Sequence, residues 1–168
     1  RAGRDGLEGR CITFYSPKDL RKMEKFIQGK PLSEQEIGRQ LLAETAAFAE
    51  SSVCRRRTLL HYFGEEYDRD NCGNCDNCIH PKTPVEACDS LLNILEVMQA
   101  VAAPFKPEHI IDIVRGRITA DVKSYNHQEL EIFGIDREHD TRYYMTVIRK
   151  AIMDGYIWRD IENFGLLS

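Results

Sequence analysis

Four of the six cysteines lie close enough along the chain to bind one metal ion. Cys54 is followed by seventeen residues and then by Cys72, Cys75 and Cys78, each separated from the next by two residues. Two-residue gaps let neighbouring thiolates converge on one ion, and the Gly and Asn residues in the gaps suit tight turns. Zinc takes four ligands in a tetrahedron, and four thiolates leave no position for a catalytic water. The spacing therefore predicts one structural zinc ion whose binding stabilises the fold.

Other uses of these cysteines are less favoured. The N-terminus has no apolar segment typical of a signal peptide, which argues against a disulfide framework. A redox pair is disfavoured because Cys75 belongs to two overlapping C-x-x-C units and no βαβ pattern surrounds them. Cys11 lies in an apolar stretch and Cys88 at the start of a helical pattern. Both are expected to be buried or half-buried thiols without metal.

Composition limits the remaining possibilities. The 168 residues are 42% hydrophobic and 30% charged, enough for one core or two small ones, with no run long enough to span a membrane. The net charge is −4, and its distribution is uneven: residues 1–83 carry 14 Lys/Arg against 13 Asp/Glu, whereas residues 84–168 carry 9 against 14. Any contact with DNA must therefore come from local basic patches. The missing start methionine suggests a piece of a longer protein.

The first half of the chain reads as short elements around the cysteines. The expected elements are a strand at 10–15, a helix from Ser16-Pro17 to near Gly29, a helix beginning at Ser33 with Glu36 completing a capping box, and an apolar stretch at 59–63 ended by Gly64. This pattern predicts a helical hairpin that a metal-bound loop stabilises.

The second half has the order of a winged-helix domain. A linker at 81–84 precedes a capping box from Thr83 to Glu86, and an amphipathic helix follows, with apolar residues repeating from Leu91 to Ala102. Further helices are expected at 109–115, at 127–133 and from the Asp140 cap to Gly155, followed by β-rich segments at 156–159 and 166–167. The predicted fold class is mainly α with a small β component: a zinc-bound helical hairpin followed by a helix-turn-helix with a β-wing.

Three groups of residues together resemble one known family. They are Arg1–Leu7; Cys54-Arg55-Arg56 with Tyr62–Glu65 and Cys72–Cys78; and Ile113–Gly116 with Val147–Arg149. In order, they are similar to the end of helicase motif VI, the zinc module and the winged helix of RecQ-family ATP-dependent DNA helicases, and the resemblance covers essentially the whole chain. The implied domains are the tail of the second RecA-like lobe (1–15), the zinc-binding helical domain (16–82) and the winged-helix domain (83–168).

The resemblance implies a parent enzyme that hydrolyses ATP with Mg²⁺, unwinds DNA 3′ to 5′ and acts in recombination and repair. Arg1 and Arg4 match arginines that contact the ATP phosphates. The fragment itself has no phosphate loop, so we expect no ATPase activity from it alone. The implied partners are fork or tailed-duplex DNA, bound without sequence preference, and repair proteins. The implied location is the bacterial nucleoid or, in a eukaryote, the nucleus.

The resemblance and the charges together nominate five DNA-binding residues. These are Arg55, Arg56, Arg115, Arg137 and Phe164, the last at the tip of the wing. Adjacent arginines diverge around a helix, so at most two of Arg55, Arg56 and Arg57 can face one phosphate track, and one could pack under the zinc loop. Phe164 could separate base pairs or pack on its own domain. Asp121 and Asp136 depart from the family pattern near Arg115 and Arg137, which lowers the expected affinity.

Two alternatives stay open on the residues alone. One is a free-standing zinc and winged-helix regulator of transcription, which would need a basic recognition helix; the motif VI match argues against it. The other is a protein-interaction module whose acidic winged helix binds partners other than DNA. The salt dependence of fork binding distinguishes this module from the helicase segment.

Overall fold

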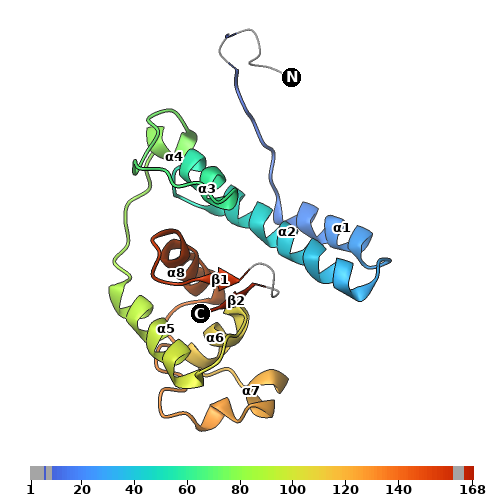
Figure 1. Ribbon diagram of the computed structural model, residues 1–168, viewed down its shortest axis with the longest axis vertical. Coiled ribbons are helices and arrows are strands. Elements are labelled where there is room, and N and C mark those ends of the chain that lie inside the picture. Colours follow the sequence, from blue (N-terminus) through green and yellow to red (C-terminus); the bar gives the residue numbers. More distant parts are fainter. Residues whose placement is uncertain (1–5, 7–8, 161–164) are drawn as a thin grey trace. The chain divides into compact units, whose positions relative to one another are not determined.

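The structure is a computed structural model that describes residue 6, residues 9–160 and residues 165–168. The chain is mainly helical and forms two compact units, Arg1–Glu50 and Ser51–Ser168 (Figure 1). No helix among the described residues is both long and apolar enough to cross a membrane. The predicted domain boundaries at 15/16 and 82/83 stay predictions.

The first unit is a pair of helices, α1 (Pro17–Ile27) and α2 (Leu32–Glu50). The expected start of α1 is confirmed, because Ser16 is the N-cap and its hydroxyl accepts a hydrogen bond from the Lys18 N–H at 3.2 Å. The start predicted for α2 is late. This helix begins at Leu32, so Ser33 lies inside its first turn and cannot serve as the cap. The Gln35 side chain instead closes the connection, donating to the Lys30 carbonyl at 2.8 Å.

The predicted strand at 10–15 is wrong. These residues form no strand, and a strand gains its stability from a partner that satisfies its backbone groups. The segment is tied down at its end by the Tyr15 hydroxyl, which donates to the Glu50 carboxylate at 2.8 Å. Cys11 is exposed, so the expectation that it is buried is also wrong. No described residue of this unit is fully buried, and Phe14 and Leu32 are 96% and 82% exposed.

The second unit begins with the cysteine-bearing loops. Helix α3 (Arg55–Tyr62) starts directly after Cys54, and the short helix α4 (Asp76–Ile79) starts directly after Cys75. Gly64 ends the α3 segment with φ +77°, a left-handed conformation that glycine adopts without steric cost. The predicted metal loop and its supporting helices therefore lie together in this unit.

The winged helix follows in the predicted order. Its elements are α5 (Cys88–Val101), α6 (Pro107–Val114), α7 (Ala120–Ser124), the 3₁₀ helix η1 (His127–Glu129), α8 (Thr141–Met153), β1 (Arg159–Asp160) and β2 (Leu166–Leu167). The two strands pair antiparallel, with Arg159 opposite Leu167, and Leu167 also bridges to Phe105 (Figure 1). The predicted fold class, mainly α with a small β-wing, is confirmed.

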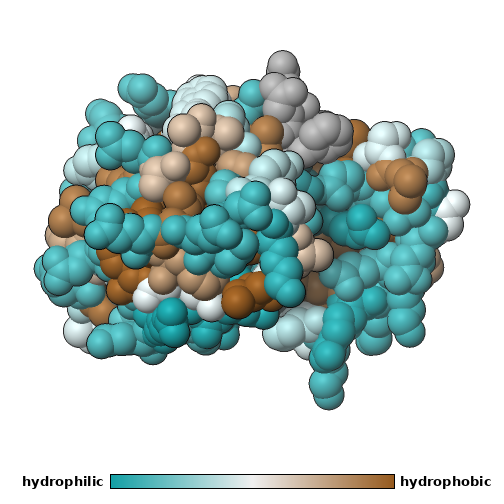
Figure 2. Space-filling view, turned by 90° about the horizontal axis from the view of Figure 1, so that it is seen from below, coloured by the Kyte–Doolittle hydropathy of each residue, from teal (hydrophilic) through white to brown (hydrophobic). Residues whose placement is uncertain are grey.

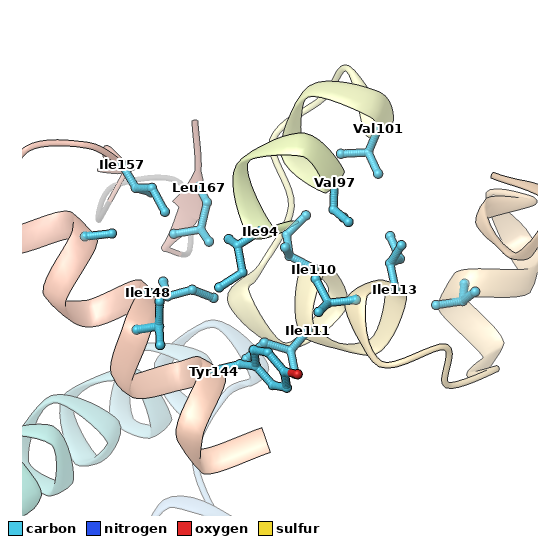
Figure 3. Close-up of a cluster of buried hydrophobic side chains, with 14 residues drawn as sticks. Ile94, Val97, Val101, Ile110, Ile111, Ile113, Tyr144, Ile148, Ile157 and Leu167 are labelled. Atoms are coloured by element: carbon cyan, nitrogen blue, oxygen red, sulfur yellow. The ribbon is translucent and has the colours of Figure 1, made fainter. Parts of the chain in front are cut away.

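The core of this unit joins three helices to the wing. Buried side chains from the three helices meet in this core (Figure 3). They are Ile94 and Val97 of α5, Ile110 and Ile113 of α6, and Ile148 of α8. Ile157 and Leu167 extend the core into the hairpin at 3% and 2% exposure. Burying each such side chain contributes about 1.5–3 kcal/mol before entropy is counted. The stripe from Leu91 to Val101 thus contributes to a packed core, as predicted, whereas Ala102, the C-cap of α5, is exposed.

Several helices of the winged helix differ from the predictions. Helix α5 begins at Cys88 and not after Thr83, because the Glu86 carboxylate accepts the Ala87 and Cys88 N–H groups at 3.2 Å each. Cys88 is exposed, so its predicted burial is wrong. The helix expected at 127–133 is one 3₁₀ turn, and the short α7, capped by Thr119, was not predicted.

The surface is mixed in character. On the face shown in Figure 2, hydrophilic side chains predominate and apolar ones lie between them. In the winged helix, the large exposed apolar side chains include Tyr156 and Trp158, at 66% and 72%.

Candidate metal centre and nucleic-acid surface

The four predicted cysteines meet at one point of the second unit. Their Sγ atoms all lie within 4.8 Å of one another, although Cys54 comes from the start of α3 and the other three from the loop at 72–78. A tetrahedral zinc site with about 2.3 Å Zn–S bonds needs sulfur–sulfur distances of about 3.8 Å, so small movements suffice to seat the ion. Cys54 is buried and the others are half-buried. The donor set fits zinc in a closed, structural site.

Backbone N–H groups prepare this cluster for thiolates. The Arg55 N–H donates to the Cys75 Sγ at 3.4 Å. A hydrogen bond from the backbone of Asn74 is the main factor that lowers the pKa of Cys72 to about 6. Donors aimed at sulfur favour the charged form, which is the form that binds a metal. The local backbone thus favours the thiolate forms of Cys72 and Cys75, whereas desolvation raises the pKa of Cys78 to about 11.

Asn77 fixes the loop that carries Cys54. Its amide nitrogen donates to the carbonyls of Ser51 at 2.8 Å and Val53 at 2.7 Å. Asn77 lies between Cys75 and Cys78 in the sequence, so these two bonds join the second knuckle to the segment just before the first ligand. Two unsatisfied carbonyls would otherwise remain in a partly buried turn, at a cost of about 1–3 kcal/mol each.

Arg55 also stabilises the loop that carries Cys72, Cys75 and Cys78. Its guanidinium makes two hydrogen bonds to Asp76, Nε to Oδ1 at 3.0 Å and Nη2 to Oδ2 at 2.9 Å. The pair holds the pKa of Asp76 at about 2, mainly through the hydrogen bond from Arg55. A two-pronged arginine–carboxylate contact fixes orientation as well as distance. Arg55 therefore has a structural role beside the cysteines, which matches the expectation that one arginine packs under the zinc loop.

Arg56 and Arg57, the two arginines that follow Arg55, lie in different surroundings. Arg56 is exposed. Arg57 is 22% exposed, and its Nη2 atom lies 3.0 Å from the Asp154 carboxylate at the end of α8. The divergence of adjacent helical residues thus separates three neighbouring arginines into three environments.

Arg115 and Arg137, predicted to contact DNA, lie near the start of α8. The Arg115 Nη1 donates to the Thr141 hydroxyl at 2.8 Å, and Arg117 approaches the same hydroxyl at 3.4 Å. Thr141 is the first residue of α8, where backbone N–H groups leave partial positive charge. The Arg115 Nε is buried and has no hydrogen-bond partner among the described residues.

Arg137 lies across two turns that end in glycine. Its Nε donates to the Gly134 carbonyl at 3.2 Å. A Cβ on Gly134 would lie 2.3 Å from the Arg137 Nη2, and one on Gly116 would lie 2.8 Å from it. Both glycines have positive φ, +78° and +67°, a conformation that glycine adopts without steric cost. Because glycine has no Cβ, the same two positions leave space for the Arg137 guanidinium. The arginine remains exposed at the surface.

Asp136 has a structural partner of its own. Its carboxylate accepts the Ser90 hydroxyl at 2.9 Å, and its carbonyl accepts the Tyr144 hydroxyl at 3.0 Å. These bonds attach the loop before α8 to α5 and to α8. The departure from the family pattern at this position therefore anchors the loop that presents Arg137.

A cluster of aromatic and imidazole rings supports the turn between α6 and η1. The His109 Nε2 and His127 Nδ1 lie 2.9 Å apart, with Phe105 stacked on His109 and Tyr125 stacked on His127. Desolvation lowers the pKa of both histidines. A buried, hydrogen-bonded pair of this kind is most stable when it carries no net charge.

The structure leaves part of the predicted site undescribed and adds residues to it. Arg1, Arg4 and Phe164 lie outside the described residues. Asn77 and Thr141 were not singled out from the sequence, and Arg57 was considered only as part of the run Arg55–Arg57, without its partner Asp154. Asn77 lies inside a C-x-x-C gap, where its side-chain partners depend on the fold, and Thr141 gives no signal beyond following the cap Asp140.

Comparisons with known proteins agree with this arrangement. A family model described as RecQ zinc-binding matches residues 17–79, and one described as RQC domain matches residues 81–168. The chain is 32% identical over 166 residues to "ATP-dependent DNA helicase RecQ" of Pasteurella multocida, covering 98% of this chain and 26% of that protein. It is 31% identical over 166 residues to the protein of the same name from Haemophilus influenzae, covering 98% of this chain and 27% of that protein.

A eukaryotic relative extends the comparison. The chain is 31% identical over 143 residues to "ATP-dependent DNA helicase hus2/rqh1" of Schizosaccharomyces pombe, covering 82% of this chain and 11% of that protein. The chain thus spans about a quarter of the length of its bacterial relatives. These matches favour a helicase segment over a free-standing regulator, and structural zinc is the metal of the matched domain. The two family models and the four-cysteine cluster show that the chain belongs to the RecQ helicase family, as a segment made of its zinc-binding and RQC winged-helix domains.

Proposed function

We propose that the chain is the DNA-gripping segment of an ATP-dependent helicase that unwinds DNA 3′ to 5′ in recombination and repair. The observation that carries the proposal is the combination, in one chain, of a four-thiol metal cluster and a winged helix in the order found in RecQ helicases. In this proposal Cys54, Cys72, Cys75 and Cys78 hold the zinc ion. The zinc supplies folding energy, and hydrolysis of ATP with Mg²⁺ belongs to the parent enzyme.

The proposed DNA surface centres on the start of α8. Arg115, Arg117 and Thr141 converge there, and Arg137 lies on the loop that leads into this helix. Guanidinium groups, a hydroxyl and helix N–H groups are donors suited to phosphate oxygens, and they carry no base specificity. Arg56 would add a contact from the zinc module. Arg55 serves the surface indirectly, by holding the zinc loop through Asp76.

The acidic balance of residues 84–168 limits affinity. We expect weak binding that favours a duplex with a single-stranded tail, where the zinc module and the winged helix act together. Phe164, which the sequence predicts at the wing tip, is the candidate for contact with the end of the duplex. Repair proteins are proposed as partners of the parent enzyme.

Fork binding at several salt concentrations tests the proposal. Each phosphate contact releases counterions, so log K against log salt should have a slope of magnitude roughly 2–4 for the proposed arginines. The double change Arg115→Ala and Arg137→Ala should reduce that magnitude by about 2 and weaken all sequences alike. The matched control is Lys22→Ala with Lys25→Ala, which removes the same charge from α1. An unchanged slope in the arginine variant would instead favour a protein-interaction role.

The parent enzyme tests the motif VI assignment. In the full-length protein, Arg4→Ala should abolish DNA-stimulated ATP hydrolysis and leave DNA binding nearly intact, because an arginine at this position acts on the phosphates during transfer. Normal turnover in that variant would contradict the role proposed for Arg4.

A further inference from the structure

The contact between Arg57 and Asp154 joins segments that are 97 residues apart in the sequence. Arg57 lies in the first turn of α3, three residues after Cys54, and the Thr58 N–H donates to the Cys54 carbonyl at 3.0 Å. The orientation of this turn therefore depends on Cys54, a member of the thiol cluster. The Arg57 guanidinium also lies 3.9 Å from Asp70, which belongs to the loop that leads to Cys72.

Asp154 occupies the junction between α8 and the wing. It is the C-cap of α8, and its N–H donates to the Lys150 carbonyl at 2.9 Å. Gly155 follows with φ +79°, and the Tyr156 N–H then donates to the Ala151 carbonyl at 2.9 Å. Ile157, 3% exposed, enters the core just before β1. A contact to Asp154 therefore constrains the point where the chain turns from α8 into the hairpin.

The environment makes this ion pair more than a surface contact. The side chains of Arg57 and Asp154 are 22% and 24% exposed. Lys150 also contacts the Asp154 carboxylate, so the carboxylate lies between a cation of its own helix and one from α3. Exposed pairs contribute little because water screens them, whereas partly buried pairs with fixed geometry resist separation. Removing Arg57 would leave Asp154 paired only with Lys150 of its own helix among these two cations and would remove this link between α3 and α8.

We propose that Arg57 is a positioning residue that couples the metal state of the cysteine cluster to the C-terminal turn of α8 and to the wing. Bound zinc fixes Cys54 and hence the first turn of α3, and Arg57 transfers this constraint to Asp154. Loss of zinc then loosens the wing even though no zinc ligand belongs to it. The inference concerns the chain's own coupling and stands whether or not the segment grips DNA as proposed.

Hydrogen–deuterium exchange on the 168-residue chain tests this coupling. In the zinc-loaded wild type, residues 150–160 and 165–168 should exchange slowly, and chelation of zinc should speed their exchange roughly threefold to tenfold. Arg57→Gln should show the faster exchange with zinc still bound, and chelation should then add little. Asp154→Asn reaches the same contact from the other side and should behave alike.

Two matched controls separate the coupling from charge and folding. Arg56→Gln removes the same charge one residue away, and Lys150→Gln removes the other partner of Asp154; both should keep the wild-type response to chelation. Zinc content measured in every sample ensures that the variants are compared with the metal bound. The proposal is overturned if zinc-loaded Arg57→Gln and Asp154→Asn both exchange like the wild type in the wing, or if chelation leaves wild-type exchange there unchanged.

Discussion

The amide of Asn77 donates to the carbonyls of Ser51 and Val53, at 2.8 and 2.7 Å, and so joins the second cysteine knuckle to the segment that carries the first ligand. Three of the four thiols are neighbours in the sequence and meet through local turns. Cys54 is remote, so its approach depends on contacts of this kind. The geometry of the metal centre is therefore determined partly by a side chain that does not bind the metal.

Replacing Asn77 by Ala should weaken the metal centre without removing a ligand. Two carbonyls would lose their donor, at a cost of roughly 1–3 kcal/mol each, and zinc affinity should fall about tenfold or more because metal binding and folding are coupled. Competition with a chromophoric chelator measures this affinity. Asn71→Ala, at an exposed position of the same loop, is the control and should have no effect. Equal affinities for the two variants would contradict the role given to Asn77.

Gly134→Ala separates backbone strain from the placement of Arg137. Gly134 and Gly155 have nearly the same φ, +78° and +79°, but only Gly134 lies against a side chain. Both alanine variants should lose about 1–2 kcal/mol of stability through the left-handed backbone. The Arg137 guanidinium can move away from a new methyl group, so the second effect should appear in binding. Fork affinity measured by fluorescence anisotropy should fall for Gly134→Ala and stay unchanged for Gly155→Ala.

Equal fork affinities for the two glycine variants would contradict this prediction. They would show that Arg137 does not need its position between Gly116 and Gly134 to contact DNA.

The pair His109 and His127 should make the winged helix less stable in acid. Desolvation lowers the folded-state pKa of both rings, so the unfolded chain binds protons first as pH falls. Their contribution is fully present above the unfolded pKa of about 6.5 and is lost as pH falls through the lowered folded values. Asp112 and Asp121 oppose the shift of His109 without reversing it. NMR titration of the ring C–H signals should give both pKa values below that of free histidine; normal values would contradict the buried pair.

Most of the architecture could be predicted from local signals. Ser16-Pro17 and Asp140 begin helices as expected because a cap needs only its own side chain and the next turn. The C-x-x-C spacing of Cys72, Cys75 and Cys78 predicted a shared site for the same reason, whereas the approach of Cys54 depends on contacts between remote segments. In contrast, the capping boxes at Ser33 and Thr83 were misplaced, since other groups close those turns: the Gln35 amide in one case and the Glu86 carboxylate in the other.

What could not be predicted depends on contacts between remote segments. The segment at 10–15 had residues suited to a strand, but no strand among the described residues pairs with it. Arg55 and Arg57 look alike in the sequence, yet one pairs with Asp76 and the other with Asp154, 97 residues away. A run of basic residues therefore indicates a nucleic-acid surface only after its ion pairs are known.

The metal content of the purified chain tests the central claim most directly. Elemental analysis of protein prepared without chelator should give one zinc per chain, and this should persist when Cys11 and Cys88, both exposed and outside the cluster, are replaced by Ala. Cys75→Ala removes one of four ligands and should lose the zinc and make the segment around 51–80 sensitive to protease, because binding energy in such sites is folding energy. Wild-type protein without zinc, or Cys75→Ala protein that keeps a full equivalent, would contradict the account.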